Sequence, residues 1–253
     1  MNLFISMGKI KFLQPFILLV IFAFSLQASN KEEIYNYYVN NRMSDWKSLI
    51  DKLNITTEKN NEMVLELVNY QYGYIGWCLE NDHNDEALVY LKLAEGNVKL
   101  LEAKKIELSL INAYKSALYG YHIALSKFSA PFIGPKSSDC AKQATLLDPN
   151  QPFGYIQMGN VRFHMPPLMG GSKTDAIGYY LKAKVMMEKN GSEIRGDWNY
   201  LSLLTTIAKA YEAINDDAKA KSMYEEILKF EPNFTWVRDE LYPKLLEKFK
   251  KQR

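Results

Sequence analysis

Histidine and cysteine are scarce in this chain of 253 residues, which has three of the first and two of the second. His83, His122 and His164 are scattered, and neither they nor Cys78 and Cys140 have the spacing of a metal-binding motif. The chain also lacks a G-x-S-x-G nucleophile elbow, and no motif marks a histidine as a catalytic base. We therefore expect no metal site, no cofactor and no enzymatic activity.

The apolar run near the N-terminus is short. Lys9 and Lys11 precede it, it covers residues 15–24, and small and polar residues follow. This three-part layout is typical of a secretory signal peptide, and the run falls short of the ~20 residues that span a bilayer. We predict a signal peptide over 1–28 and a mature domain over 29–253, exported to the periplasm or beyond. An uncleaved N-terminal anchor is the alternative.

The chain has no formal net charge once the predicted signal peptide is removed. Residues 1–28 contain two lysines and no acid, so Lys and Arg fall from 31 to 29 and equal the 29 Asp and Glu. A neutral surface offers no broad electrostatic footprint for nucleic acid, so we predict no nucleic-acid binding. We also expect no stable membrane insertion after the signal is cleaved.

Export would place both cysteines in an oxidising compartment, where a bridge can form. Cys78 and Cys140 each lie on the apolar face of an expected helix. Free cysteine is among the most buried residue types. We therefore expect two buried thiols, with a disulfide as the alternative.

Alternating strand patterns are absent, and nearly every segment after residue 30 has helical periodicity. Proline, glycine and asparagine punctuate the breaks between segments. We predict helices over 32–40, 45–53, 60–80, 85–103, 106–127, 137–147, 152–164, 173–189, 197–214, 217–230 and 235–250.

Residues 201–234, LSLLTTIAKAYEAINDDAKAKSMYEEILKFEPNF, form the clearest repeat-like unit. This unit resembles the tetratricopeptide repeat, a 34-residue helix–turn–helix module. Leu204 replaces the usual tryptophan and Asn215 the usual turn glycine, so the match is incomplete. The matching positions are Ile207, Ala208, Tyr211, Ala220, Tyr224, Ile227 and the terminating Pro232.

Two earlier units follow the same pattern with an insertion. Ala220 follows Ala208 by 12 positions, whereas Ala176 follows Gly159 by 17 and Ser137 follows Gly120 by 17. Both therefore carry about five extra residues between their helices, and we interpret Gly120 and Gly159 as small packing positions. A looser unit occupies 66–103.

These units predict an all-α fold, a tetratricopeptide-like α-hairpin repeat superhelix of about four helix pairs with a C-terminal capping helix. One hairpin cannot bury its apolar face alone, because stacked neighbours must cover it. In such modules the first helix of each pair lines the concave face, and the final helix covers the exposed end.

The stretch MPPLMGGSK looks at first like a phosphate loop. Pro166–Pro167 must end a helix, Gly170–Gly171 allows a tight reversal, and Ser172 with Asp175 forms a capping box for the next helix. A phosphate loop needs G-x-x-x-x-G-K-[ST] after a strand. We therefore predict a connector between helices. Anion binding at the helix start by Ser172–Thr174 is the alternative.

Several phrases, among them YGYIGWC and GNVRFHMPPLMGGSKTDAIGYYLKA, are similar to secreted tetratricopeptide-type proteins of Bacteroidetes-like bacteria. The aromatic–Pro–Gly-Gly connector resembles the helical T component of TRAP transporters. That second resemblance implies a periplasmic accessory that handles ligands near a solute-binding protein.

We predict an exported, non-enzymatic protein that binds or scaffolds a protein or peptide partner in the cell envelope; the TRAP-like accessory is the alternative. The expected site is a concave groove edged by 129–138 and 164–174. An asparagine amide grips a peptide backbone with donor and acceptor together, although local pairing is the alternative for Asn160. Trp198 and Trp236 are interpreted as core residues. The candidate binding residues are Asn160, Phe163, Lys136, Ser137, Ser172, Lys173 and Lys209.

Overall fold

The computed structural model describes residues 30–189 and 194–251, and within these ranges every regular element is helical. The all-α prediction is therefore confirmed for the described part of the chain. The predicted signal peptide, 1–28, and the expected break at Asn190–Gly191 lie outside the described residues.

The helices follow one another through short connections, starting with a helix over residues 30–39. Two 3₁₀ turns, η1 and η2, interrupt the series, and η4 is a π-helical turn. The elements are α2 (Met43–Ile55), α3 (Asn61–Glu80), α4 (Asn84–Ala103), α5 (Leu108–Leu125), η1 (Lys127–Ser129), α6 (Ala130–Leu147), α7 (Pro152–His164), η2 (Pro167–Met169), α8 (Lys173–Lys189), α9 (Trp198–Glu212), α10 (Asp217–Phe230), η4 (Val237–Leu241) and α11 (Tyr242–Lys251).

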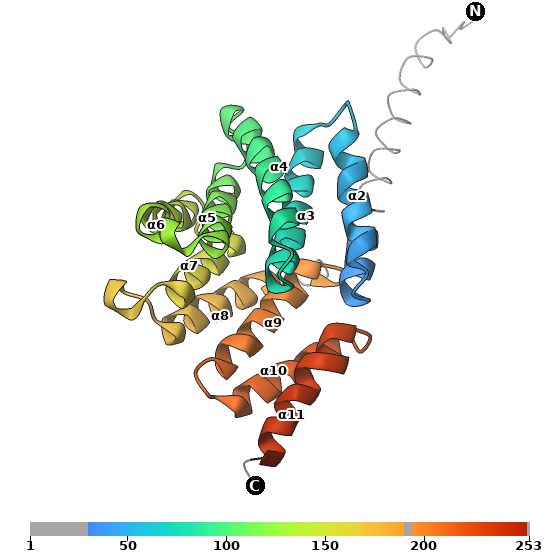
Figure 1. The fold of residues 1–253 in the computed structure, drawn as a ribbon, viewed down its shortest axis with the longest axis vertical. Coiled ribbons are helices and arrows are strands. Elements are labelled where there is room, and N and C mark those ends of the chain that lie inside the picture. The colour runs from blue at the N-terminus through green and yellow to red at the C-terminus, as the bar shows by residue number, and fades with distance from the viewer. Residues whose placement is uncertain (1–29, 190–193, 252–253) are drawn as a thin grey trace, which may run out of the picture.

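Neighbouring helices pack in pairs: α3 on α4, α5 on α6, α7 on α8 and α9 on α10. Each pair also packs on the next, and α11 packs on α10. Figure 1 shows the pairs following one another in chain order along an arc, which brings α11 back below α2. This arrangement matches the predicted side-by-side stacking of hairpins.

One predicted connector was wrong, and one predicted helix contains an unexpected turn. The segment 129–138 was expected as a connector, but α6 already begins at Ala130 and includes Pro131 and Pro135. Pro131 lies in the first turn, where proline costs no hydrogen bond, and Pro135 removes only one bond close to the helix start. The segment 235–250 is helical from residue 235 as predicted, but residues 237–241 within it form the π-helical turn η4.

Small residues allow close helix packing where the repeat pattern expects them, with one exception. Ala208 and Ala220 are fully buried, and a Cβ added to Gly159 would lie 2.3 Å from Cε1 of Tyr180. Gly120 was wrongly assigned to such a position, since it is exposed and an added Cβ there meets nothing within 4 Å.

The MPPLMGGSK stretch joins α7 to α8 through η2. Gly170 has φ of 95°, and a Cβ on Gly171 would lie 1.8 Å from the Met165 carbonyl oxygen, so the reversal requires both glycines. The Ser172 hydroxyl accepts a 3.1 Å hydrogen bond from the Asp175 amide, as a helix cap. The connector prediction is confirmed.

Both cysteines are free thiols. Cys78 in α3 is buried, as predicted, and burial raises the pKa of its thiol to about 12, which keeps it protonated. Cys140 in α6 is only half-buried.

The buried residues form two hydrophobic clusters, and Tyr35 and Tyr38 of the first helix pack against both. The Tyr35 hydroxyl donates a 2.8 Å hydrogen bond to Glu231, and the Thr235 hydroxyl donates a 2.9 Å bond to the Val39 carbonyl. The first helix therefore fastens the segment after α10 to the start of the array, and this closure creates the pocket described next.

A candidate binding pocket

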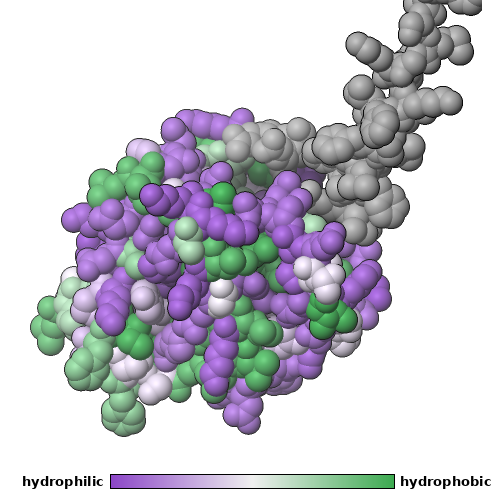
Figure 2. Space-filling model, turned by 90° about the horizontal axis from the view of Figure 1, so that it is seen from above, coloured by the Kyte–Doolittle hydropathy of each residue, from purple (hydrophilic) through white to green (hydrophobic). Residues whose placement is uncertain are grey.

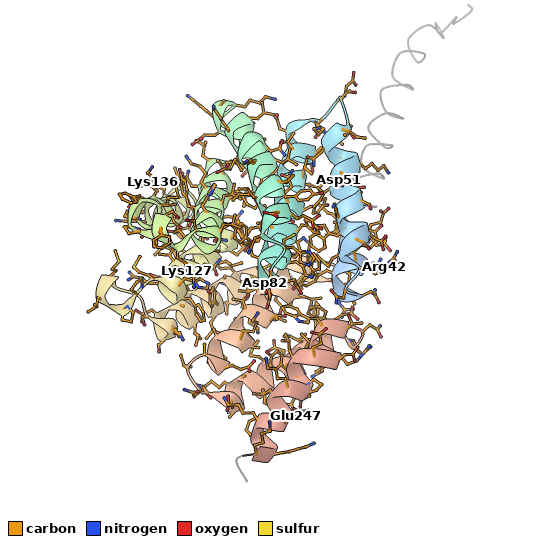
Figure 3. All side chains as sticks on the ribbon, in the orientation of Figure 1. Arg42, Asp51, Asp82, Lys127, Lys136 and Glu247 are labelled. Carbon is orange, nitrogen blue, oxygen red and sulfur yellow. The ribbon has the colours of Figure 1, made fainter. Side chains whose placement is uncertain are left out.

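A cavity of about 400 Å³ lies between α3, α9 and the segment that follows α10. Its size falls in the lower part of the range of small-ligand sites. Two labels in Figure 3 help to locate it: Asp82 and Arg42 follow the lining residues Asn81 and Asn41 in the chain. Both lie at the end of α2–α4 that faces α9 and α11. The lining residues are Tyr38, Asn41, Met43, Tyr72, Gly73, Gly76, Trp77, Glu80, Asn81, Tyr121, Trp198, Ser202, Thr205, Thr206, Lys209, Phe234, Trp236 and Glu240.

Helix α3 supplies one wall from residues spaced by about four, which lie on one face of a helix. Tyr72, Gly76 and Glu80 form this stripe, with Gly73 and Trp77 beside them. A Cβ on Gly73 would lie 2.6 Å from the Trp198 ring, and one on Gly76 would lie 3.1 Å from the Tyr121 hydroxyl. The glycines therefore make the room that the aromatic rings and the cavity occupy.

Helix α9 supplies the facing wall, again at helical spacing, through Trp198, Ser202, Thr205 and Lys209. The Trp198 indole nitrogen donates a 2.9 Å hydrogen bond to the Asn69 side-chain oxygen, which fixes the ring. Trp198 is only 5% exposed, so it forms the floor of the pocket.

Further aromatic rings surround that floor. The Tyr38 ring centroid lies 5.6 Å from that of Trp198 and 5.1 Å from that of Phe234. The Trp46 ring meets Trp198 edge-on at 5.0 Å. Such contacts stabilise aromatic pairs beyond simple burial, so the walls are pre-formed.

The tyrosines of the pocket stay neutral. Burial raises the pKa of Tyr38, Tyr72 and Tyr121. The Tyr121 hydroxyl donates a 3.0 Å hydrogen bond to the Tyr72 carbonyl. Neutral phenols offer a ligand ring faces and hydrogen bonds, and they do not act as bases at neutral pH.

The charged groups of the pocket lie at its exposed end. Lys209 of α9 forms an ion pair with Glu80 of α3 across the opening. The Lys209 ammonium also lies 5.2 Å from the centre of the Trp236 ring, within cation–π range. Glu240, in the π-helical turn η4, adds a second carboxylate to the lining.

Of the residues predicted for the site, Lys209 lines this pocket. Asn160 is half-buried in α7; its amide nitrogen donates to Gln157 at 3.0 Å and its oxygen accepts from the Tyr180 hydroxyl at 2.8 Å. Phe163, also in α7, lies under the Lys173 ammonium at 5.6 Å from the ring centre.

The remaining predicted residues lie in α6 and at the α7–α8 turn, outside the pocket lining. Lys136 is exposed, whereas Ser137 is buried and donates a 2.9 Å hydrogen bond to the Ser116 carbonyl. Ser172 caps α8, and Lys173 donates to the Ala213 carbonyl at 3.3 Å. The structure therefore does not bring the seven predicted residues together.

The pocket aromatics Tyr38, Tyr72, Trp77 and Phe234 were not predicted as site residues. Trp198 and Trp236, interpreted as core, line the pocket as well. The signal in the sequence was YGYIGWC, where two glycines alternate with large aromatics at helical spacing. Small residues beside large ones on one helix face leave a hollow rather than a packed seam.

Within 30–189 and 194–251, no group of three or more histidine, cysteine, aspartate or glutamate side chains is arranged to hold a metal ion. No helix in the same ranges is both long enough and apolar enough to cross a membrane. No protein-family model matches the sequence, and no curated protein matches it either.

Proposed function

We propose that this chain is an exported, non-enzymatic binding protein in which a tetratricopeptide-like superhelix of α-hairpins forms a partner site at the aromatic pocket. The partner is a protein or peptide segment in the cell envelope that inserts one apolar or aromatic side chain. The observation that carries the proposal is the pre-formed pocket itself, with seven aromatic side chains in its lining.

The repeat architecture is supported by packing that recurs along the chain. Four helix pairs stack in order, and α3 packs on α5 while α5 packs on α7, as first helices do in such arrays. In the last unit Ile207, Ala208, Tyr224 and Ile227 are fully buried at the positions where the repeat pattern needs core residues. α11 then covers the end of the array, as a capping helix does.

The chemistry of the pocket suits a side chain with an apolar body and a polar edge. Ring faces of Trp77, Trp198 and Trp236 offer apolar contact. The hydroxyls of Ser202 and Thr206 line the pocket and suit a peptide group, and the Glu80 carboxylate lies at the exposed end, paired with Lys209. Large aromatic anchors with a few polar groups around them dominate many protein interfaces.

A second candidate function is ligand handling of the TRAP T-component type. It is favoured by one observation: the helix over 30–39 and the segment 234–240 close the concave side, which leaves a bounded cavity and not a long open groove. A cavity of about 400 Å³ lined by aromatic rings also suits a small amphiphilic molecule.

A photo-crosslinking residue placed at Thr206, inside the pocket, tests both functions in the full chain exported by its own cells. The matched control carries the same residue at Lys99, which is exposed on α4. We expect a protein or peptide adduct at position 206 and none at position 99. A small-molecule adduct at 206 would favour the second function instead.

The substitution Thr206→Phe supplies the complementary measurement, because a phenyl ring would occupy the cavity. We expect it to abolish the adduct formed from a crosslinker at Ser202, with the thermal unfolding midpoint unchanged within a few degrees. If position 206 gives no adduct, and affinity capture recovers the same partners with wild type and Thr206→Phe, the pocket is not the binding site.

A further inference from the structure

Four large apolar side chains point into solvent from the turns of the two middle hairpins. Phe128 in η1 is 93% exposed and Phe132, in the first turn of α6, is 76% exposed. Leu168 and Met169 in η2 are 102% and 61% exposed. We call these four side chains the apolar edge. Soluble proteins rarely expose such residues together unless the surface binds something.

The two turns belong to neighbouring hairpins. Each connects the first helix of its pair to the second, and α7 packs on both α5 and α6, so η1 and η2 lie at the same end of adjacent units. Figure 2 shows hydrophobic surface at the lower left of the molecule, the side on which α6 and the η2 turn lie in Figure 1. The four side chains therefore lie at the same end of two adjacent hairpins.

The turns that carry the apolar edge are rich in positive charge. Segments 126–138 and 162–174 contain Lys127, Lys136, Arg162 and Lys173, and the nearest acids along the chain are Asp139 and Asp175, which directly follow the two segments. Among the described residues, no carboxylate forms an ion pair with any of the four. Figure 3 labels Lys127 and Lys136 on the same side of the molecule as the η2 turn.

The η2 turn is held in its outward position by hydrogen bonds to Arg162 of α7. The Arg162 guanidinium donates a 2.6 Å hydrogen bond to the Gly170 carbonyl, and the Ser172 amide donates a 2.9 Å bond to the Arg162 carbonyl. Gly170 is in the left-handed region, with φ of 95°. These contacts fix the base of the turn and leave Leu168 at its tip without a protein neighbour.

We propose that the apolar edge docks on an anionic phospholipid surface. Apolar tips enter the boundary between headgroups and acyl chains, while the lysines around them meet lipid phosphates; each contribution alone is weak and the two together give a stable contact. Because the four cations outnumber the adjoining Asp139 and Asp175, the local charge is positive and complements an anionic bilayer. The contact is peripheral, needs no spanning helix, and does not depend on the ligand of the aromatic pocket.

A local optical readout tests the contact in the full chain. Leu168→Trp places an indole at the tip of η2, and Ile55→Trp places one at the exposed end of α2 as the matched control, since Ile55 is also apolar and 82% exposed. Both are mixed with vesicles of phosphatidylcholine and phosphatidylglycerol that carry brominated acyl chains. The N-terminal residues are common to both variants, so the difference in quenching reports the edge alone.

We expect quenching above the wild-type level for Leu168→Trp only, weaker in pure phosphatidylcholine and weaker in 1 M salt, where the Debye length falls from ~10 Å to ~3 Å. The substitutions Lys127→Gln and Lys136→Gln each remove one positive charge. Made in the Leu168→Trp variant, each should weaken its affinity for the vesicles roughly fivefold. Phe128→Ser weakens it further.

Three results would overturn the proposal. The first is equal quenching of the two variants, and the second is quenching indifferent to lipid charge. The third is a shift of wild type to a dimer in sedimentation that Phe128→Ser abolishes, because a second copy would then cover the edge.

Discussion

The aromatic pocket and the apolar edge use similar residues in opposite ways. Trp198 in the pocket is 5% exposed and its indole nitrogen is bonded to Asn69, whereas Phe128 at the edge is 93% exposed. The pocket lies between α3 and α9, where aromatics of both hydrophobic clusters meet. The edge sits on turns that no other element covers. Residue type alone therefore does not define a site; the neighbours of each side chain do.

The difference begins in the connections. The α9–α10 connection holds only 213–216, while the α7–α8 connection holds 165–172. In the α5–α6 hairpin the extra residues became helix, so that α6 starts at Ala130. The long α7–α8 connection and the extended start of α6 both place apolar side chains outside the surface where the helices pack. A turn of four residues is too short to do so.

The largest expected effect separates the two surfaces by stability. Trp198→Ala removes a buried ring and leaves the Asn69 side chain short of a donor, and we expect a loss of about 3–5 kcal/mol in the free energy of unfolding. Phe128→Ala also removes an aromatic ring, but one that lies in solvent. We expect the free energy of unfolding to change by no more than about 0.5 kcal/mol. Urea denaturation of both variants measures the contrast. Equal losses would mean that the edge is packed against something in the folded chain.

A second pair compares two glycines of similar helices. A Cβ at Gly73 would lie 2.6 Å from Trp198 and 2.8 Å from Trp46. Gly73→Ala should cost roughly 1–3 kcal/mol through overpacking, less the helix gain of about 1 kcal/mol. Gly120→Ala meets open space and should stabilise by about 0.5–1 kcal/mol. Opposite shifts in thermal midpoint are expected, and a stabilising Gly73→Ala would show that the pocket floor is loosely packed.

The fold was largely predictable because each level of the sequence agreed with the next. Helical periodicity, capping residues and small packing positions all indicate the same hairpins, and α7, α8 and α10 begin and end where the pattern predicted. The failures were local. Pro135 suggested a connector, although proline near a helix start is tolerated. Gly120 was chosen because Ser137 follows it by 17 positions, the spacing found between Gly159 and Ala176. That shared spacing reflects the similar insertions, and Gly120 does not lie in a helix contact.

The candidate site was far less predictable. Lys209 was predicted, but the pocket depends on Tyr38, Phe234 and Trp236, which come from segments about 200 residues apart. Only the closure of the array, through bonds such as Thr235 to the Val39 carbonyl, brings them together. No periodicity within one segment carries that information. Residues of the middle hairpins were favoured instead because their insertions stand out in a repeat comparison.

A third prediction concerns the α9–α10 turn, where Asn215 stands at the position for which the tetratricopeptide pattern would predict glycine. Its φ is 61°, in the left-handed region that asparagine tolerates better than most residues. Asn215→Ala should lose roughly 1 kcal/mol, because alanine gains nothing locally to offset the strain, while Asn215→Gly should stay within a few tenths of wild type. Thermal denaturation distinguishes them. Two equal losses would mean that the asparagine side chain, and not its backbone conformation, stabilises the turn.

The smallest effect compares, by pH, the N-terminal caps of the two helices of this same hairpin. Asp197 caps α9 beside the pocket floor, and its carboxylate accepts a 2.9 Å hydrogen bond from the Asn199 amide. Burial raises the pKa of Asp197 above its ordinary 3.8. Asp216 caps α10 in solvent, and its hydrogen bond with Lys219 lowers the pKa of that carboxyl below 3.8.

The two caps should therefore respond to pH with opposite signs. The folded chain holds the Asp197 proton to higher pH than the unfolded chain does, so this group's contribution to stability falls as the pH rises above 3.8 and through the raised value. The Asp216 contribution is fully present above pH 3.8 and is lost as the pH falls through the lowered value.

Asparagine caps a helix nearly as well as aspartate, so Asp197→Asn should be neutral or stabilising at pH 7, and Asp216→Asn slightly destabilising. Thermal midpoints of both variants relative to wild type, measured from pH 3 to pH 7, should diverge as the pH rises. If they instead move together, the cap beside the pocket is as solvated as the outer one, and the α9 wall is less enclosed than the aromatic packing around Trp198 indicates.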